Sequence, residues 1–431
     1  MDDARKLTTG PLRSRQGFYF GWRVVLAMFL VTTMTYGNTL YGFIILTDPL
    51  AKEFGWSSAA TGSLVSAMWL TAPLALLIAP AIHRYGAFAM LIGGLLLQAV
   101  CLALVGHIDS FGQLYVLRIV MGVGKLVSVV SVPVMVTTWF SRRFSTAMAL
   151  AWCGGSFGGF VMAPATEWLL SFMTWRDAAL SLGGITALAV LVIALLCRGA
   201  RDPAALGTGI DGDPLVLPLD PAGVSEESGE TATAKVPMSE LRSINVFTAA
   251  LMAIALMLSG IGALSAMSQV PPLMEAGGIS AQLAATFLGL TAAASAFGQV
   301  AVGWLLDRWK LARCNLLVGV LLAAGLAALI LLQHDHSVAA AAFGAIAVGV
   351  GIGANEMLWI TLTKRQFGSR LFAYTYGGWS FALAMGYALG GPVGGWAFDH
   401  LPLVSFPLLV MALYLPALTV AVWRPGKREL A

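Results

Sequence analysis

The sequence has little charge: Asp, Glu, Lys and Arg make up only 11% of its residues, whereas 58% are hydrophobic. Soluble chains carry roughly 25% charged residues. This deficit excludes an ordinary soluble globular protein and indicates a membrane protein. The four cysteines are scattered and form no CxxC pair, so neither a disulfide framework nor a zinc site is expected.

Motifs of enzymes and of ATP-driven machines are also missing. The run Gly122-Val123-Gly124-Lys125 resembles a phosphate loop only in part, because Ile119 stands where the first glycine belongs and Leu126 replaces the Ser or Thr. No HExxH motif and no catalytic constellation are present. We therefore expect no enzyme, no cofactor, no metal and no nucleic-acid partner, and any transport must be driven by gradients.

What the chain has instead is a series of long apolar runs. They lie near 22–46, 58–82, 87–107, 111–139, 145–172, 175–197, 243–269, 280–305, 312–333, 337–363, 370–397 and 402–423. A helix needs about 20 apolar residues to cross a bilayer, and the runs are too long, and too weakly alternating, for barrel strands. The sequence thus predicts an all-α membrane protein with twelve transmembrane helices.

The basic residues indicate how these helices are oriented. With the N-terminus inside, 21 of the 25 Lys and Arg residues fall in loops or termini on that side. Positive loops stay in the cytoplasm, so we expect a multi-pass inner-membrane protein with both termini cytoplasmic. Residues 1–21 lack the apolar core and cleavage site of a signal peptide, which makes 22–46 a permanent span.

One long break divides the chain into two halves. Residues 198–242 are rich in Gly, Pro, Asp and Glu and predict a mobile cytoplasmic linker. The expected parts are a cytoplasmic N-terminal segment (1–21), a six-helix bundle (22–197), the linker (198–242), a second six-helix bundle (243–423) and a cytoplasmic tail (424–431).

The two halves share an internal repeat. In the first half it reads Gly55-Trp56-Ser57-Ser58, Ala59-Ala60-Thr61 and, after an apolar run, His83-Arg84-Tyr85-Gly86. In the second half it reads Gly278-Ile279-Ser280, Ala284-Ala285-Thr286 and Asp307-Arg308-Trp309-Lys310. Six-span repeats are a recurring transporter plan with the substrate site near the midplane, between the halves.

Two motifs resemble signature elements of the major facilitator superfamily. The first is the loop Gly303-Trp304-Leu305-Leu306-Asp307-Arg308, and the second is Arg118-Ile119-Val120-Met121-Gly122-Val123-Gly124. The first half has a copy of the loop motif, Ala79-Pro80-Ala81-Ile82-His83-Arg84, in which His83 stands in place of an acid. The resemblance covers nearly the whole chain. It implies two six-helix bundles related by pseudo-twofold symmetry, a cavity lined by spans one, four, seven and ten, and a functional monomer.

Other segments resemble the monocarboxylate and oxalate/formate branch of that superfamily. They are Gly21-Trp22-Arg23-Val24-Val25, Phe54-Gly55-Trp56-Ser57, Pro133, Trp139-Phe140-Ser141-Arg142-Arg143 and Gly154 to Gly159. Three positions depart from the branch: Leu40 replaces a Lys of the animal members, and Ser295 and Gln299 replace an Asp and an Arg. The lysine that a bacterial oxalate carrier of the branch has in span eleven is missing too. These departures speak against a simple lactate–proton mechanism.

Three charged residues fall inside the predicted spans. Arg118 and Lys125 lie on one face of span four, and Glu356 lies beside Asn355 in span ten. Such a group costs roughly 2.5–3.5 kcal/mol at the bilayer centre, so each is a candidate functional residue. We predict that Lys125 binds an anionic substrate group, that Glu356 is the proton-coupling acid or the counter-ion of Lys125, and that Arg118 takes part in coupling. The alternatives are a static Lys125–Glu356 ion pair and a structural Arg118.

Polar and aromatic residues on the same helices complete the predicted site. The substrate-binding candidates besides Lys125 are Tyr36, Asn38, Tyr41, Gln269, Gln299, Asn355 and Tyr376. The gating candidates are Arg84, Asp307 and Arg308. The alternatives are an aromatic packing face around Tyr376 and charged loops that only enforce topology.

The predicted function is secondary active transport of a small organic solute, a carboxylate-containing anion, by alternating access, with protons as the candidate coupling ion. Efflux of a drug or metabolite is the second possibility, and it predicts a wide apolar cavity that tolerates loss of Lys125. A transporter-like membrane sensor is the alternative from another class. The expected partners are the small-molecule substrate and the lipid bilayer.

Overall fold

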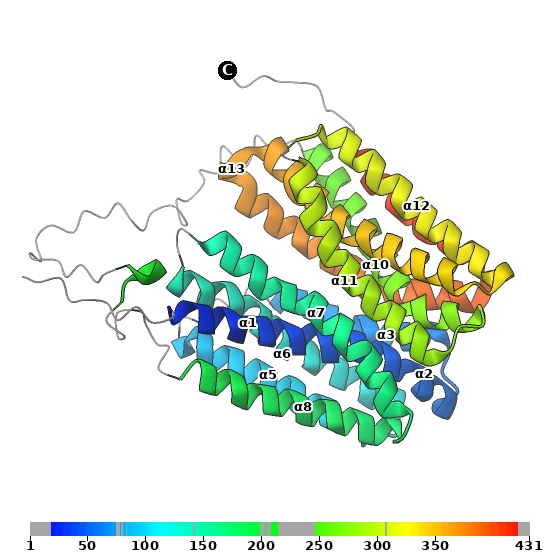
Figure 1. The fold of residues 1–431 in the computed structure, drawn as a ribbon, viewed down its shortest axis with the longest axis horizontal. Coiled ribbons are helices and arrows are strands. Elements are labelled where there is room, and N and C mark those ends of the chain that lie inside the picture. The colour runs from blue at the N-terminus through cyan, green and yellow to red at the C-terminus, as the bar shows by residue number, and fades with distance from the viewer. Residues whose placement is uncertain are drawn as a thin grey trace, which may run out of the picture.

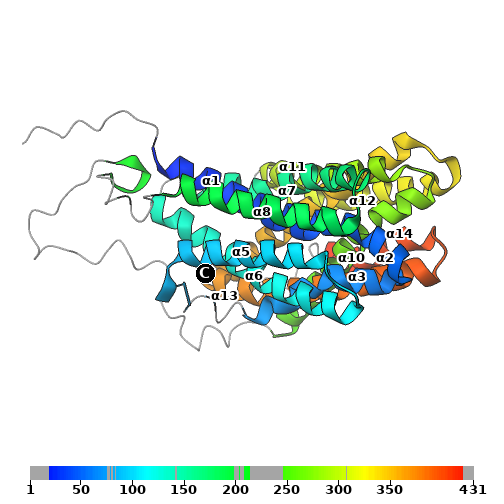
Figure 2. The ribbon, with the colours of Figure 1, turned by 90° about the horizontal axis from the view of Figure 1, so that it is seen from below.

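The computed structural model describes residues 19–74, 78, 81–82, 84–140, 143–198, 203, 208–213, 246–306 and 308–420. This part of the chain consists of helices joined by turns and loops and contains no β-strand. Nine of its helices are long and apolar enough to cross a membrane. They run side by side along the long axis of the molecule (Figures 1 and 2).

In the first half, nine helical segments have described bounds. They are α1 (Gly21–Tyr36), the π-helix η1 (Gly37–Gly42), α2 (Phe43–Phe54), α3 (Ser58–Ser66), the 3-10 helix η2 (Ala67–Leu74), α5 (Ala87–Val105), α6 (Phe111–Trp139), α7 (Phe144–Leu170) and α8 (Trp175–Leu196). After η4 (Ile210–Gly212) come α10 (Val246–Ala276), α11 (Ala281–Leu306), α12 (Leu311–Asp335), α13 (Val338–His400) and α14 (Ser405–Val420).

The helix α13 holds two membrane spans. It is 63 residues long, yet the Tyr387 hydroxyl donates a hydrogen bond of 3.2 Å to Oε1 of Glu356. Thirty-one residues of straight helix would hold these two side chains about 46 Å apart, so α13 must turn back on itself between them. With α1–η1–α2 as one span, α3–η2 as another and α14 as the last, the twelve predicted spans are accounted for, and the all-α fold is confirmed.

The first span is longer than its apolar run. The run ends at Leu46, but α2 continues to Phe54 and stops where Gly55 takes a φ of +67°. Gly278, at the matching place of the second half, also has a positive φ of +83°. Left-handed backbone is readily adopted only by glycine, and the shared turn supports the internal repeat.

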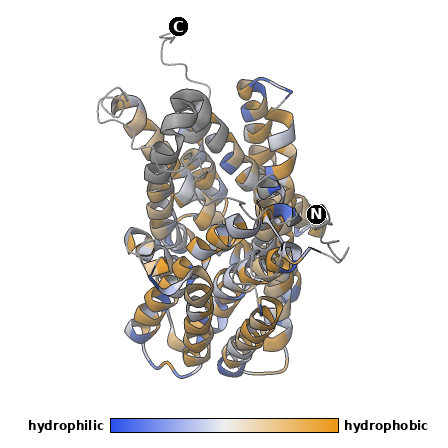
Figure 3. Cartoon of the chain, turned by 90° about the vertical axis from the view of Figure 1, so that its left-hand side faces the viewer, coloured by the Kyte–Doolittle hydropathy of each residue, from blue (hydrophilic) through white to orange (hydrophobic). Residues whose placement is uncertain are grey.

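Each half packs as its own bundle. The helix α1 packs on α7, and α5 lies between α6 and α8; in the second half α13 packs on α10, α11 and α12. Hydrophobic residues cover most of the helices (Figure 3). Leu188, Val300 and Leu316, each more than 60% exposed, lie on the surface that faces lipid in a multi-pass membrane protein.

The halves touch through α3 with α13 and through α7 with α11. We call the side at which α2 ends and α3 begins the far side, and the side at which α8 ends and α10 begins the linker side. The halves lie close together at the far side, and their ribbons diverge toward the linker side (Figure 1).

A hydrogen-bonded clasp holds the halves together at the far side. The carboxylate of Asp399 on α13 accepts hydrogen bonds from the backbone N–H groups of Ser58 (3.2 Å) and Ala59 (3.0 Å) at the start of α3. Below it, Gly62 and Gly391 lie so close that a Cβ on either would collide with the backbone oxygen of the other. This contact between the halves requires glycine at both positions.

Parts of the predicted domain organisation lie outside the described residues. They are residues 1–18 of the N-terminal segment, residues 199–202, 204–207 and 214–242 of the linker, and the whole tail (424–431).

Candidate functional site

Arg118 is fully buried on α6, and its guanidinium binds the backbone of two other spans. Its Nη1 donates to the oxygen of Thr39 at 2.8 Å, its Nε to Leu64 at 3.0 Å and its Nη2 to Val65 at 3.3 Å. Its Cζ lies 3.8 Å from the ring centroid of Phe43. Every direction of the guanidinium fork is therefore occupied by groups of the protein itself.

These carbonyl groups lie where the first two spans depart from regular α-helix. Thr39 is in the π-helix η1, and Leu64 and Val65 lie where α3 passes into the 3-10 helix η2. Irregular turns leave carbonyl groups without their usual intrahelical partner, and inside a membrane these must be satisfied by protein. Arg118 satisfies them, so its geometry matches the structural alternative, and the coupling role stays a prediction.

Lys125 lies two turns further along the same face of α6 and is only 5% exposed. Its Nζ is 2.9 Å from the ring centroid of Trp69 and 5.3 Å from that of Tyr36. Among the described residues this ammonium has no hydrogen-bond partner. The indole N–H of Trp69 is likewise buried without a partner. Two adjacent donors are thus left unsatisfied at the middle of the bundle.

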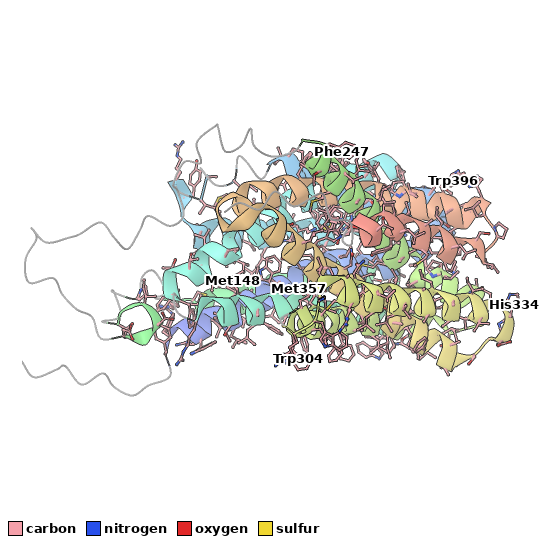
Figure 4. All side chains as sticks on the ribbon, turned by 90° about the horizontal axis from the view of Figure 1, so that it is seen from above. Met148, Phe247, Trp304, His334, Met357 and Trp396 are labelled. Carbon is pink, nitrogen blue, oxygen red and sulfur yellow. The ribbon has the colours of Figure 1, made fainter. Side chains whose placement is uncertain are left out.

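A chain of contacts leads from Lys125 into the second half. The rings of Trp69 on η2 and Tyr387 on α13 are 4.6 Å apart. The Tyr387 hydroxyl donates to Oε1 of Glu356 at 3.2 Å, and Nε2 of Gln299 on α11 donates to Oε2 at 2.9 Å. The static Lys125–Glu356 ion pair is not formed, because two aromatic rings stand between the charges. Met357, the residue after Glu356, is labelled near the middle of the molecule in Figure 4.

Three of the other predicted site residues point elsewhere. The amide of Asn38 donates to Oγ1 of Thr186 on α8 at 2.8 Å, away from α6. Tyr41 packs against Gly159 of α7. Gln269 lines a cavity of about 90 Å³ at the far side, together with Asp48 and other residues, and this cavity does not include Lys125.

For the remaining candidates the structure gives fewer contacts. Asn355 is buried beside Glu356. The side chain of Tyr376 lies outside the described residues, as does Asp307. Arg308 and Arg84 are exposed, and each stacks on a neighbouring ring, that of Trp304 at 3.8 Å and that of Tyr85 at 5.4 Å. Trp304 lies at the edge of the molecule in Figure 4. The gating role of the loop residues stays a prediction.

Sequence reasoning missed Trp69 and Tyr387, which join the two charges. One signal was available for Trp69: tryptophan in membrane proteins gathers at the interfaces, and this residue lies well inside the second apolar run. For Tyr387 there was no comparable signal, because its role follows from the packing of α13 on the first half.

Charged groups held between two helical bundles at mid-depth are suited to carrying a polar solute across a membrane. Among the described residues no group of three or more His, Cys, Asp or Glu side chains is placed to hold a metal ion. The class of protein that this fold and site define is a multi-pass membrane transporter, not an enzyme.

The chain belongs to the Major Facilitator Superfamily, whose family model matches residues 24–377. It is 25% identical to monocarboxylate transporter 12-B of Danio rerio over 88% of this chain and 81% of that protein. It is 28% identical to monocarboxylate transporter 11 of Mus musculus over 72% of this chain and 65% of that protein.

Solved structures share the fold. A bacterial homolog of the human lysosomal transporter Spinster, in an inward-facing and unoccupied conformation, matches with a TM-score of 0.68 at 17% identity, covering 96% of this chain and 100% of that one. The nucleoside transporter NupG (D323A mutant) matches with a TM-score of 0.68 at 10% identity, covering 93% and 98%. At these identities the likeness shows the fold alone.

Proposed function

We propose that the protein is a secondary active transporter that carries a small carboxylate across the inner membrane by alternating access. The observation that carries this proposal is the buried ammonium of Lys125, for which the described part of the chain offers no hydrogen-bond partner. An unpaired buried charge costs several kcal/mol, whereas a cation–π contact contributes about 0.5–2 kcal/mol. Trp69 and Tyr36 thus offset only part of the cost, and the anionic group of a bound substrate would offset the rest.

The contacts between the halves support alternating access. Asp399, Gly391 and Gly62 join the halves at the far side, and the ribbons diverge at the linker side (Figure 1). If the linker side is cytoplasmic, as the Lys and Arg distribution indicates, this arrangement is closed to the outside. Rocking of the bundles 22–197 and 243–423 about the Lys125 region would expose the substrate first to one side and then to the other.

Glu356 is the proposed proton carrier. Both of its oxygens accept hydrogen bonds, from Tyr387 and Gln299, which stabilises the charged carboxylate. A proton on Oε1 turns that oxygen into a donor and reverses its bond with the Tyr387 hydroxyl, which can also accept, whereas a proton on Oε2 disrupts the bond from the Gln299 amide N–H, which can only donate. Because Tyr387 packs on Trp69, protonation of Glu356 alters the contact that joins the halves beside Lys125. Proton binding and substrate binding would in this way act on the same interface.

The named relatives point to the same substrate class. The similar curated proteins are monocarboxylate transporters, and a monocarboxylate presents one planar anionic group to the site. The cytoplasmic position of both termini and a functional monomer complete the proposal, the first from the positive-inside distribution of basic residues and the second from the superfamily's usual state.

Ligand-induced thermal stabilisation of the purified protein tests this function. The panel contains acetate, pyruvate, lactate, oxalate, succinate and benzoate, with the corresponding amides as neutral controls. We expect at least one acid to raise the melting temperature of the wild type and to have no effect on Lys125→Met. The matched control is Lys310→Met, which removes an exposed lysine and should keep the full response.

Two results would overturn the proposal. One is an equal response of Lys125→Met and the wild type to the same acid, which would place the anion elsewhere. The other is the absence of any response to acids together with stabilisation by neutral or cationic compounds, which would identify an efflux carrier.

A further inference from the structure

We propose that Trp69 is a direct ligand of the substrate, and that its indole N–H and the Lys125 ammonium hold the two oxygens of one carboxylate. The inference rests on the proposed carboxylate transport and deepens it, because it names a second binding group and the form of anion that fits. No role was assigned to Trp69 from the sequence.

The geometry of the two donors carries the inference. The Nζ atom of Lys125 is 2.9 Å from the centroid of the Trp69 ring, so the ammonium lies over the face of the ring and is close to the indole nitrogen at the edge of that ring. Both atoms are buried, and neither has a hydrogen-bond partner among the residues that the structure describes. The indole nitrogen can only donate a hydrogen bond, and an ammonium also has no acceptor. The two groups cannot satisfy each other. The ammonium needs an acceptor above the ring and the N–H needs one at the ring edge, so an acceptor group with two oxygens can serve both.

A carboxylate meets this need better than other acceptors. Its two oxygens lie on one rigid plane and can each accept from a different donor, while its charge balances that of Lys125. A neutral amide offers one acceptor oxygen and no charge. The site therefore selects a ligand with one planar, doubly accepting anionic group.

A second buried tryptophan shows that an unpartnered indole is not enough by itself. Trp139 on α6 is fully buried, and within the described residues its Nε1 also lacks a partner. Its ring packs against the rings of Tyr19 and Phe20, in an aromatic cluster near the linker side. Trp69 differs because a cation without a partner lies on its ring. Trp139 provides a matched control, since Trp139→Phe removes the same kind of buried N–H away from Lys125.

The position of Trp69 also links binding to the second half of the protein. Lys125 and Trp69 both belong to the first half, so the carboxylate would be held by that half alone. Tyr387 of the second half packs on the same indole and bonds to Glu356. A carboxylate bound to the indole N–H would hold the Trp69 ring in one orientation. Tyr387 of the second half packs on this ring when the two halves come together.

The test measures binding of the most stabilising acid of the panel by isothermal titration to purified wild type, Trp69→Phe, Trp139→Phe and Lys125→Met. Trp69→Phe keeps an aromatic face for the ammonium but removes the N–H. We expect it to weaken binding about 10- to 100-fold, the effect of losing a hydrogen bond to a charged group. Trp139→Phe should bind as the wild type does.

The result separates the inference from the proposed function. Unchanged affinity in Trp69→Phe, with binding abolished in Lys125→Met, overturns the role of Trp69 and leaves carboxylate transport in place. No binding of any acid to the wild type overturns both. If Trp69→Phe does not fold, replacement of Trp69 by 3-benzothienylalanine, which has the same shape with sulfur in place of N–H, gives the same comparison.

Discussion

Glu356 and Tyr387 are joined by a hydrogen bond of 3.2 Å, although both belong to α13 and thirty-one residues separate them. The bond ties the tenth span to the eleventh. The ring of Tyr387 contacts Trp69 of the first half. The acid in the second half is therefore connected to the lysine in the first half without an ion pair between them.

The variant Glu356→Gln tests proton coupling. Glutamine keeps one carbonyl oxygen that can accept from Tyr387 or from Gln299, but it has an NH2 group in place of the other oxygen and cannot carry a proton. We expect loss of uptake driven by a pH gradient in proteoliposomes, while exchange of labelled for unlabelled substrate continues. Glu167→Gln, at the far side of the molecule, should keep both activities. Gradient-driven uptake at the wild-type level in Glu356→Gln would rule out Glu356 as the proton carrier.

Lys125→Met should have a second effect, on the ligand-free protein. Methionine fills a similar volume, and the substitution removes a buried charge that lacks a partner. Burying an ion costs several kcal/mol when no partner offsets its lost hydration, and methionine carries no such cost. We expect the ligand-free variant to melt no lower than the wild type. A clearly lower melting temperature would mean that the ammonium is already satisfied without a ligand.

Arg118→Met should behave in the opposite way. It leaves the carbonyl groups of Thr39, Leu64 and Val65 without their donor at the irregular turns. Each unsatisfied buried group costs about 1–3 kcal/mol, so we expect a large drop in melting temperature and in yield of folded protein. Arg118→Lys keeps the charge but not the planar guanidinium fork, so its melting temperature should lie between those of the wild type and Arg118→Met. A fully stable Arg118→Met would show that the guanidinium does not hold these spans.

Asp399→Asn should weaken the clasp at the far side. The carboxylate caps the start of α3 in the other half, and charge at a helix N-terminus contributes about 0.3–1 kcal/mol. The loss should raise the population open at the far side up to roughly five-fold, since 1.4 kcal/mol is a factor of ten. Spin-label distances between α3 and the end of α13 report the opening.

The control for the clasp is Asp335→Asn, an exposed acid at the end of α12, which should leave the distances unchanged. Gly391→Ala provides a stronger perturbation of the same contact, because its methyl group would collide with the backbone of Gly62. If neither Asp399→Asn nor Gly391→Ala changes the distances, the clasp does not control opening.

The number of spans and the candidate charges could be predicted because both follow from local composition. Long apolar runs must become helices in a bilayer, since each backbone group has to be satisfied within its own segment. Lys125 and Glu356 could be identified as candidate functional residues because a charged side chain inside such an apolar run is energetically costly. The family followed from short loop motifs, and the match over residues 24–377 confirms it.

Only the tertiary structure decided which groups meet. Trp69, Lys125, Tyr387 and Glu356 come from four different spans, and no sequence spacing predicts that they form one chain of contacts. The same holds for Arg118, whose partners are carbonyl groups freed by a π-turn and a 3-10 turn that apolar composition does not reveal. Hydropathy determines whether a segment crosses the membrane. The close packing of the helices determines which face of that segment contacts which neighbouring helix.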